Sequence, residues 1–415
     1  GGGVTGPGPS RDQVARRDQI DDADVARGRG DTPGTQRRHH LNNAGAALSP
    51  RVVTDMVRAH LDLEATIGGY EAAAAARGAM DECYRTMAAL VRTAPRNIAV
   101  TSSATAAYAQ ALSAFDFAPG DAIVTTSADY LSNRIMFESL ATRRGVRIVE
   151  AAELPEGGVD PGSVAEQVRT VRPRLVAVTW VPTFGGLVQR VEEVGDVCAE
   201  AGVPYMVDGC QAVGQLDIDV AATRCDFLAA TARKFLRGPR GIGFLYVSDA
   251  ALARGMHPLL VDMRGATWTA AGGYATYEGA RRFEQWEQPF ALALGMGAAA
   301  RYALDAGIAR ISARAHALAA DVRRRLARIP GVRSLDRGGR LSAIAAFECE
   351  GRDAAMLVTA LREHGVNVSS QSRDENVVSL ERLGARSLLR VSPHYYNDAG
   401  DLGALESALR ELLRP

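Results

Sequence analysis

Seven short, continuously apolar runs between residues 97 and 247 restrict the fold more than any other feature of the sequence. A strand with both faces buried needs such a run, because neither side of the sheet meets water. Helical patterns lie between many of the runs. The sequence therefore predicts an α/β fold with a mostly parallel seven-stranded sheet, covered by helices on both sides. The runs are 97–102, 121–127, 147–152, 174–181, 204–209, 226–231 and 241–247.

The pattern changes on either side of this region. Beyond about residue 285, long helical patterns precede a few strands and two more helices, which predicts a smaller α+β domain over 285–415 and a large domain over 39–284. Residues 1–38 are rich in Gly, Pro, Arg and Asp and lack apolar periodicity, which predicts a disordered linker. Two interpretations stay open: a tether within a longer polypeptide, or a tag remnant joined to a flexible tail.

Charge and cysteine content limit the classes of partner. The 48 basic side chains balance 48 acidic ones, and the absence of a long basic run argues against a nucleic-acid surface. No apolar stretch has the length of a transmembrane helix, which argues against a membrane protein. The five cysteines show no metal-ligand spacing, so we expect reduced thiols, a cytoplasmic location and no metal site. They are Cys83, Cys198, Cys210, Cys225 and Cys349.

The chain contains a single lysine, Lys234, beside 47 arginines. A GC-rich coding sequence replaces lysine by arginine wherever only a positive charge is needed, and chance survival is one explanation for the exception. The other is chemical, because a lysine amine can lose its proton and form an imine with a carbonyl, whereas arginine stays protonated. Lys234 follows the predicted strand 226–231, and ligands of such sheets bind at the carboxyl ends of strands.

Further polar side chains lie at the ends of the neighbouring strands. Asp208 stands near the end of 204–209, where a carboxylate is costly unless it is paired, and Gln211 follows three residues later. Thr231 and Arg233 lie beside Lys234. An acid, a carboxamide and the only lysine together predict a pyridoxal phosphate site. The lysine would form an imine with the cofactor, and Asp208 would keep the pyridine nitrogen protonated.

A helix is predicted to begin after the strand 97–102, at Ser103, Ala104 and Thr105. Backbone N–H groups at a helix start, aided by hydroxyls, can bind a phosphate group. An ordinary N-cap is the simpler alternative for the same residues.

The order of these residues resembles a known family. The segments "DGCQ" at 208–211 and "TARKFLRGPRGIG" at 231–243 match the pattern D-G-x-Q … T-x-x-K-x-x-x-G-P-x-G-x-G of class V aminotransferases, a branch of the fold-type I pyridoxal phosphate enzymes. "SSATAA" resembles the phosphate loop of this family. The resemblance covers about residues 39–415. It implies a fold-type I transferase fold, bound pyridoxal phosphate and a homodimer with the site near the interface.

The resemblance also implies roles outside that pattern. In "SADYLSN", Tyr130 falls where the family has an aromatic or histidine ring stacked on the cofactor. "VPTFGGLVQ" puts Thr183 where many members have an asparagine near the ring oxygen. "LLRVSPHYYND" puts Arg390 where the family binds the substrate carboxylate, which the fork of a guanidinium suits. "LNNAGAALSP" resembles the substrate-side segment and implies contacts from Asn43 and Ala44.

The sequence departs from the family in two places. Thr231 to Lys234 read Thr-Ala-Arg-Lys where many desulfurases have Ser-x-His-Lys, and Trp286 and Glu287 replace the Gly-Thr that reaches the neighbouring subunit's phosphate. "IGGYEAA", "TARKFLRGPRG" and "GARRFEQWEQP" resemble most closely the branch that holds isopenicillin N epimerase-like proteins and the C–S lyases of ergothioneine biosynthesis. Lyase domains related to this branch occur inside leinamycin-type polyketide synthases. The linker-like N-terminus of this chain would be consistent with a domain excised from such a synthase.

Several activities fit this resemblance. A desulfurase needs a nucleophilic cysteine shortly before Arg390, and "VSSQSRDENVVSLERLGARS" has none. We therefore expect a C–S lyase that cleaves an S-substituted cysteine by β-elimination to a thiol or persulfide, pyruvate and ammonia. The substrate is either free or carried on a larger thioether or polyketide. Lys234, Tyr130 and Asp208 form the expected catalytic set. A desulfurase, an aminotransferase, an epimerase and a non-enzymatic relative stay as alternatives.

Overall fold

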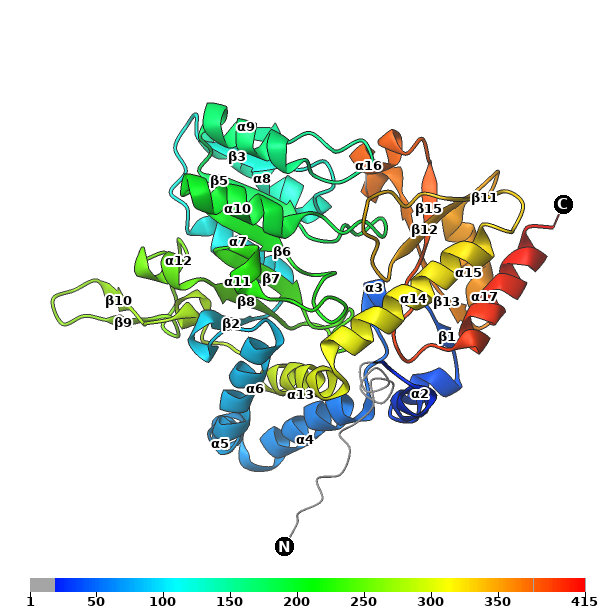
Figure 1. The fold of residues 1–415 in the computed structure, drawn as a ribbon. Helices are drawn as coiled ribbons and strands as arrows, with labels where there is room; N and C mark the ends of the chain where they lie inside the picture. The colour runs from blue at the N-terminus through cyan, green and yellow to red at the C-terminus, as the bar shows by residue number, and fades with distance from the viewer. Residues whose placement is uncertain (1–18, 376, 415) are drawn as a thin grey trace, which may run out of the picture.

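A seven-stranded sheet forms the centre of this computed structural model, which describes residues 19–375 and 377–414 (Figure 1). Its strands are β2 (Ile98–Thr101), β3 (Ala122–Thr125), β4 (Arg147–Glu150), β5 (Leu175–Thr179), β6 (Tyr205–Asp208), β7 (Phe227–Thr231) and β8 (Gly243–Val247). The order across the sheet is β2-β8-β7-β6-β5-β3-β4. Strands from β7 to β4 pair in parallel, whereas β8 is antiparallel to both β7 and β2. The predicted mostly parallel sheet is confirmed, and each predicted run contains one strand.

Helices cover both faces of the sheet. They include α7 (Ala104–Ser113), α8 (Leu131–Arg144), α9 (Pro161–Val171), α10 (Val191–Ala201) and α11 (Val220–Thr223). Because side chains alternate along a strand, Phe227 belongs to the apolar cluster on one face of the sheet and Leu228 to the cluster on the other face. Each fully buried side chain of this kind contributes about 1.5–3 kcal/mol. The parallel strands β3, β5, β6 and β7 therefore end at one common edge of a rigid core.

A second sheet lies in the C-terminal part of the chain. It has four antiparallel strands in the order β11-β12-β15-β14, with helices against it. The elements are β11 (Val332–Ser334), β12 (Ala345–Cys349), β14 (Ser369–Ser372), β15 (Ser387–Val391), α14 (Ile308–Leu326), α15 (Ala354–Glu363), α16 (Val377–Arg382), α17 (Ala399–Leu412) and the 3₁₀ turn η4 (Arg373–Glu375). A small α+β unit is thus present where the sequence predicts one.

Elements on either side of the predicted domain boundary, between residues 284 and 285, pack against elements on the other side. The short strand β1 (His39–His40) pairs in parallel with β13 (Val366–Asn367), and α13 (Phe290–Ala306) packs on α4 (Arg51–Ile67) and α6 (Arg77–Leu90). The division into 39–284 and 285–415 stays a prediction. The remaining elements are α2 (Asp22–Gly30), α3 (Asn43–Ala46), α5 (Gly69–Ala75), α12 (Asp249–Ala253), β9 (Ala266–Trp268), β10 (Tyr274–Thr276), η1 (Pro33–Gln36), η2 (Pro95–Asn97) and η3 (Ala280–Phe283).

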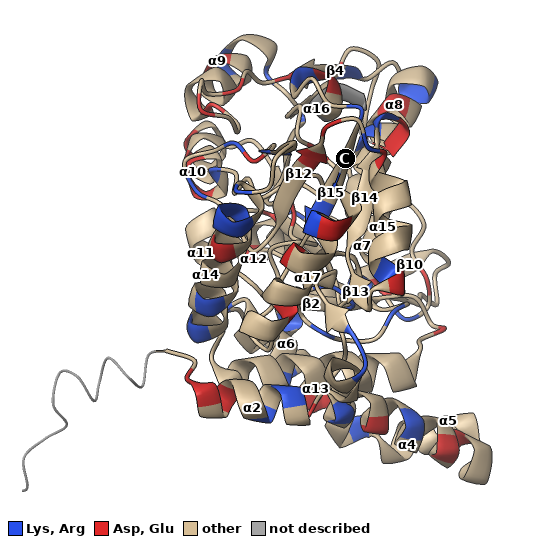
Figure 2. Ribbon diagram, turned by 90° about the vertical axis from the view of Figure 1, so that its right-hand side faces the viewer, with Lys and Arg blue, Asp and Glu red and all other residues tan. Residues whose placement is uncertain are grey.

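Acidic and basic residues are interspersed on the surface. Figure 2 shows both signs along α2 and α4, and each helix has an internal ion pair, Arg27–Asp24 on α2 and Arg58–Asp55 on α4. Exposed pairs of this kind contribute little to stability. No helix among the described residues is both long and apolar enough to cross a membrane.

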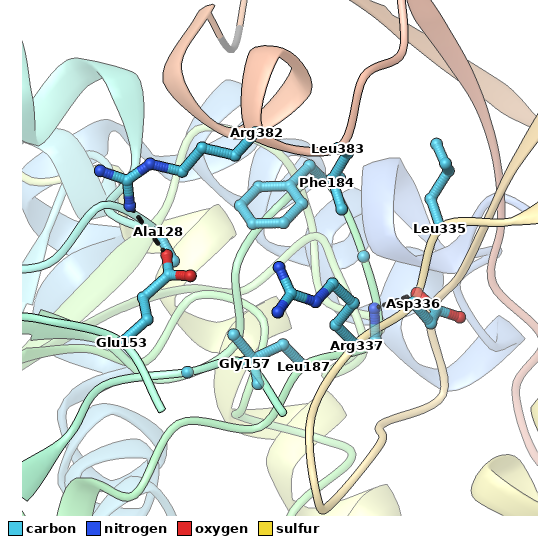
Figure 3. A pocket seen from close by; sticks show the side chains of 13 residues that line it. Ala128, Glu153, Gly157, Phe184, Leu187, Leu335, Asp336, Arg337, Arg382 and Leu383 are labelled. Atoms are coloured by element: carbon cyan, nitrogen blue, oxygen red, sulfur yellow. Dashed lines mark hydrogen bonds and ion pairs between the residues drawn. The ribbon is translucent and has the colours of Figure 1, made fainter. Parts of the chain in front are cut away.

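A small cavity lies among loops from both parts of the chain, next to Arg382 at the end of α16 (Figure 3). Phe184, Leu187 and Arg337 line it from loops of both parts of the chain. The Arg382 guanidinium at the end of α16 pairs with Glu150 at 2.6 Å and Glu153 at 3.0 Å. This double ion pair ties the segment between β14 and β15 to the edge strand β4.

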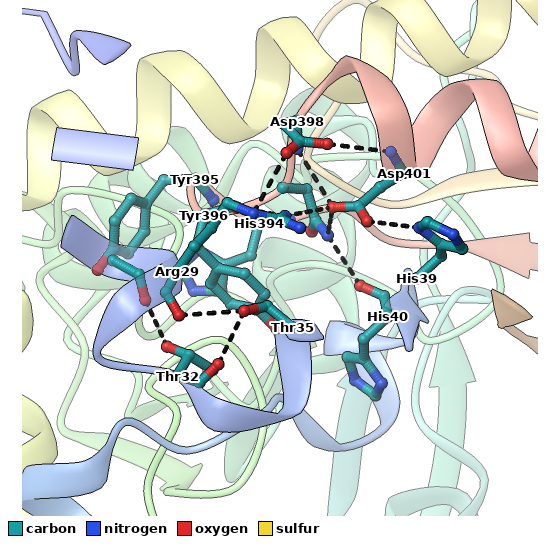
Figure 4. Close-up of polar contacts among 12 residues, drawn as sticks. Arg29, Thr32, Thr35, His39, His40, His394, Tyr395, Tyr396, Asp398 and Asp401 are labelled. Atoms are coloured by element: carbon teal, nitrogen blue, oxygen red, sulfur yellow. Dashed lines mark hydrogen bonds and ion pairs between the residues drawn. The ribbon is translucent and has the colours of Figure 1, made fainter. Parts of the chain in front are cut away.

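Residues 19–38 form a docked helix and turn, so the predicted disordered linker over 1–38 is wrong for this part, and residues 1–18 lie outside the described residues. α2 begins with a capping box in which the side chains of Asp21 and Asp24 accept from each other's backbone N–H. Arg29 pairs with Asp401 at 2.8 Å (Figure 4). The helix buries few apolar atoms and is held largely by polar contacts, which apolar periodicity does not reveal.

Deletion of residues 1–38 is expected to lower the thermal midpoint by several degrees relative to deletion of residues 1–18. The buried Arg237 donates to the Thr32 hydroxyl at 2.5 Å, and the longer deletion removes that partner. An unsatisfied buried polar group costs about 1–3 kcal/mol, and each kcal/mol shifts the midpoint of a large domain by about 2–4 °C. Scanning calorimetry of both truncated proteins measures the difference. Equal midpoints would show that residues 19–38 contribute nothing to stability.

Candidate active site

Lys234 lies at the common carboxyl edge of the parallel strands, three residues after the end of β7. Its side chain is buried, with an exposed fraction of 7% for the residue. Burial is the main cause of a lowered pKa for its amine, and the nearby guanidinium of Arg233 acts in the same direction. A lower pKa increases the fraction of neutral amine, which is the nucleophilic and basic form.

Asp208 ends β6, the strand beside β7, and is also buried. Its Oδ1 accepts a hydrogen bond from the backbone N–H of Cys210 at 2.9 Å, and its Oδ2 accepts from Asn133 Nδ2 at 2.9 Å. Both partners donate, and each oxygen keeps a further lone pair. A protonated ring nitrogen could use one of these lone pairs.

The Tyr130 ring faces the lysine. Lys234 Nζ lies 5.9 Å from the centroid of this ring. The backbone N–H of Tyr130 donates to Asp129 Oδ1 at 2.7 Å and lies 3.2 Å from Thr179 Oγ1, which fixes the start of α8 on the sheet edge. The ring thus lies beside the lysine, and its stacking on the cofactor stays a prediction.

Arg390 lies on β15 and reaches the same site from the second sheet. Its Nη1 donates to the Thr183 carbonyl at 2.9 Å and its Nε donates to Ser369 Oγ at 3.0 Å. No carboxylate pairs with it among the described residues, although it is only 5% exposed. Burial, with Arg233 nearby, lowers the pKa of Arg390 to about 10. A buried guanidinium without a counter-ion is well suited to an anionic ligand such as a substrate carboxylate.

Thr183, Thr231 and Arg233 take up positions around these groups. Thr183 meets Arg390 through its carbonyl, so its predicted place near a ring oxygen stays a prediction. Thr231 is the last residue of β7 and is buried. The Arg233 guanidinium donates to the carbonyl of Gly45, which joins the lysine loop to the segment that contains α3.

Asn43 and Ala44 are both buried, and their predicted contact with the substrate stays a prediction. Asn43 Nδ2 donates to the Ser392 carbonyl at 2.8 Å and its Oδ1 accepts from the Tyr396 hydroxyl. Partly exposed positions on the same segment are Asn42 and Gly45. The segment resembles the expected one, but the first turn of α3 rotates the predicted residues toward the second sheet.

Gln211 is joined to the same segment. Its Nε2 donates to the Ala44 carbonyl at 3.0 Å, whereas its Oε1 is buried and has no hydrogen-bond partner among the described residues. A buried polar atom without a partner usually signals an absent ligand or water. Gln211 Oε1 could therefore accept a hydrogen bond from a polar substituent of the cofactor ring.

The start of α7 offers backbone N–H groups. Ser103 caps the helix by accepting from the N–H of Ala106 at 3.0 Å, so the N-cap is confirmed, whereas the phosphate cradle stays a prediction. A Cβ on Gly243 would lie 2.8 Å from the backbone nitrogen of Ala104, so only glycine lets β8 pass this close to the turn. The amides of Ala104 and Thr105 are first-turn donors that no intrahelical carbonyl can satisfy.

Asn133 and Asp129 are site residues that the sequence analysis missed. Asn133 Nδ2 donates to Asp208 and lies one helical turn after Asp129. Their spacing in the sequence could have revealed them. Asp129 and Asn133 are four residues apart on either side of Tyr130, so at the start of a predicted helix their side chains lie on the same face.

The C-terminal region contacts the loop that contains Lys234 through His394, which Figure 4 labels. His394 Nε2 lies 2.7 Å from the carbonyl of Phe235, and His394 Nδ1 accepts from the N–H of Tyr395 at 2.8 Å. Burial lowers the pKa of His394 to about 3, so the ring is neutral and Nε2 carries the hydrogen. This bond connects the residue after Lys234 to the loop after Arg390.

Arg390→Lys is expected to raise the KM for amino-acid substrates about tenfold to 100-fold and to change kcat less. The flat fork that binds two carboxylate oxygens is lost, although the charge is retained. A hydrogen bond to a charged group contributes about 1.5–3 kcal/mol, which sets this range. Arg323→Lys is a matched control, because Arg323 on α14 pairs with Asp336 at 2.7 Å. Initial rates against substrate concentration give both constants, and an unchanged KM would assign the carboxylate to another group.

The residues at the sheet edge fit pyridoxal phosphate. A buried lysine with a lowered pKa, a carboxylate with spare acceptor capacity, an aromatic ring and free helix amides meet the needs of its aldehyde, ring nitrogen, ring face and phosphate. The sheet order and this set of groups together define a pyridoxal phosphate-dependent α/β protein of fold type I.

Comparison with known proteins gives the same class. Residues 39–405 match the family model described as aminotransferase class-V. A probable cysteine desulfurase of Methanothermobacter thermautotrophicus is 26% identical over 349 residues, which cover 83% of this chain and 86% of the relative. One from Mycolicibacterium paratuberculosis is 28% identical over 415 residues, and the match covers 95% of this chain but 59% of that longer relative.

Solved structures share the fold. The cysteine desulfurase from Thermococcus onnurineus superposes with a TM-score of 0.83 at 23% identity, covering 94% of this chain and 98% of that one. A cystine C–S lyase in complex with its reaction product cysteine persulfide superposes with a TM-score of 0.80 at 21% identity, covering 92% and 99%. The chain belongs to the class V aminotransferase family, and pyridoxal phosphate is its cofactor.

Proposed function

We propose that this protein is a pyridoxal phosphate-dependent carbon–sulfur lyase that cleaves an S-substituted cysteine by β-elimination. The relatives described as cysteine desulfurases and the cystine C–S lyase act on the same bond of cysteine, which supports the choice of substrate class. The positions and the raised pKa values of the five cysteine thiols favour elimination over desulfuration. The sequence has no cysteine between Cys349 and Arg390, where a desulfurase needs one.

The five thiols are poor sulfur acceptors. Cys349 lies on β12 and is buried, and burial raises its pKa to about 11. Cys210 lies near Asp208, and burial together with that carboxylate raises its pKa well above the ordinary value. A thiolate is the nucleophilic form, so neither thiol suits an attack on substrate sulfur near neutral pH. The remaining three are buried, and burial raises the pKa of each to about 12.

The residues of the site divide the work of elimination. Arg390 would bind the substrate carboxylate, Tyr130 would pack on the cofactor ring, and Asp208 would hold a proton on the ring nitrogen. Bound pyridoxal phosphate supplies an electron sink for the charge that develops at Cα. The Lys234 amine would remove the Cα proton. The Cβ–S electron pair then leaves with sulfur as a thiol or persulfide, and the three-carbon remainder hydrolyses to pyruvate and ammonia.

The narrower assignment is to the branch of ergothioneine-type C–S lyases and isopenicillin N epimerase-like proteins. Its support is the segment "GARRFEQWEQP", in which Trp286 and Glu287 replace the Gly-Thr pair. An origin as a lyase domain of a polyketide synthase, with a substrate carried on a larger thioether, belongs to the same proposal. A homodimer is also proposed, since exposed apolar side chains gather on residues 259–286. They are Leu259, Leu260, Met263, Trp268, Tyr274, Tyr277 and Trp286.

Product analysis decides among the activities. The protein is incubated with S-alkyl cysteines, a cysteine S-oxide and cystine. Pyruvate with an equal amount of thiol or persulfide supports the lyase. A keto acid that keeps its sulfur would point to an aminotransferase, and loss of optical activity without pyruvate would point to an epimerase. Alanine as the product, abolished by Cys349→Ser, would restore the desulfurase and overturn the proposal.

A further inference from the structure

Asp129 is a buried carboxylate that no cation pairs with among the described residues. Four groups from three elements converge on it. Thr125 Oγ1 lies 2.5 Å from Oδ2, and Thr179 Oγ1 lies 2.6 Å from Oδ1. The N–H of Tyr130 and Nδ2 of Asn133 also reach Oδ1, at 2.7 Å and 3.1 Å. A buried carboxylate is costly unless such donors satisfy it.

Asn133 joins this carboxylate to the one at the centre of the site. Its Nδ2 lies 3.1 Å from Asp129 Oδ1 and 2.9 Å from Asp208 Oδ2. An amide nitrogen carries two hydrogens, so each carboxylate receives one of them. The amide orientation is therefore fixed, because its oxygen would face two acceptors if it were turned.

The bridge matters because two carboxylates lie close together in a buried place. Their mutual repulsion favours protonation of one of them unless donors compensate it. Burial is the largest cause of a raised pKa for Asp129, and Asp208 adds to it, while the bonds from Thr125, Thr179 and Asn133 act against both. Loss of the bridging amide removes one donor from each carboxylate at once.

Asp129 also fixes Tyr130. The N–H of Tyr130 donates to Oδ1 of Asp129, and Thr179 Oγ1 is held between the two, so the start of α8 is tied to β5. The aromatic ring and the carboxylate that would contact the cofactor thus depend on one buried network drawn from β3, β5, β6 and α8.

We propose that Asn133 and Asp129 are positioning residues for the cofactor. Asn133 fixes the plane of the Asp208 carboxylate, and Asp129 fixes both the Asn133 amide and the backbone of Tyr130. The simpler alternative is that the network only anchors the start of α8. The two interpretations differ in what happens to bound pyridoxal phosphate, not in what happens to stability.

Asn133→Leu tests the proposal against a matched control, Asn97→Leu. Both asparagines are 3% exposed, and Asn97 Nδ2 likewise donates to a carboxylate, Asp249 Oδ1, and to the carbonyl of Val247, both at 2.8 Å. The cofactor is removed with hydroxylamine and the protein is titrated with pyridoxal phosphate. We expect the dissociation constant to rise about tenfold to 100-fold for Asn133→Leu and to stay within about twofold for Asn97→Leu.

The visible circular dichroism of the bound cofactor is the second readout. Asn133→Leu is expected to change the amplitude of this band, because the ring nitrogen partner is no longer fixed, while Asn97→Leu keeps the wild-type band. Asp129→Asn is the second variant. It keeps the volume but removes the negative charge and puts an NH₂ group in place of one accepting oxygen, so the network that Asn133 and Tyr130 share loses part of its acceptor capacity. It should weaken cofactor binding in the same direction.

The proposal is overturned if Asn133→Leu and Asp129→Asn lose thermal stability like Asn97→Leu but keep the wild-type dissociation constant and visible band. If Asn133→Leu does not fold, Asp129→Asn alone decides. No amino-acid substrate is present in these titrations, so their outcome is independent of whether the reaction is elimination.

Discussion

Lys234→Arg is expected to abolish turnover although the positive charge is retained. Arginine stays protonated, so it can neither form an imine with the cofactor nor accept the Cα proton. Loss of the general base alone is worth roughly 10²–10⁴-fold in rate, and loss of covalent attachment adds to this. Initial rates of pyruvate release from an S-substituted cysteine measure the effect.

Lys234→Ala provides the matched comparison for this variant. Alanine leaves space beside Asp208 and Tyr130, so an added small primary amine should restore part of the rate to Lys234→Ala. The same amine should not help Lys234→Arg, whose side chain still occupies the space. Wild-type turnover in Lys234→Arg would exclude the lysine from the reaction.

Asp208→Asn is expected to retain the cofactor and to lower the rate about tenfold to 150-fold. The amide can still accept from the N–H of Cys210 or from Asn133, but it cannot hold a proton on the ring nitrogen. A hydrogen bond to a charged group is worth about 1.5–3 kcal/mol, which converts to this range of rates.

The control for Asp208→Asn is Asp401→Asn. Asp401 is equally buried and accepts from Arg29 and His39, yet it lies in the network of Figure 4 away from the sheet edge. Asp401→Asn should lower the thermal midpoint while kcat stays near wild type. A wild-type rate in Asp208→Asn, with bound cofactor, would contradict the role given to Asp208.

The central sheet was predictable because its strands are buried on both faces and therefore apolar throughout. Lys234 and Asp208 were predictable for a related reason. A lone lysine in an arginine-rich chain and a carboxylate at the end of an apolar strand both require a chemical explanation. The resemblance to a family then supplied Arg390, which no local pattern distinguishes from the other arginines.

Other features could not be predicted because they depend on tertiary contacts. α2 docks through Arg29 and Thr32, and its sequence looks like a linker since few apolar side chains take part. The burial of Asn43 could not be predicted, because it results from hydrogen bonds to Ser392 and Tyr396, which follow the distant strand β15. Asn133 was missed because its importance lies in a bridge between two carboxylates that are far apart in the sequence, Asp129 and Asp208.

Reduction of the cofactor-loaded protein with borohydride, followed by peptide mapping, tests the central claim most directly. Because the chain has one lysine, a pyridoxyl group fixed by reduction should appear on a single peptide, the one that contains Lys234. Label on that peptide alone is the predicted result. Label only on the N-terminal amine, or on no peptide at all, would contradict the account.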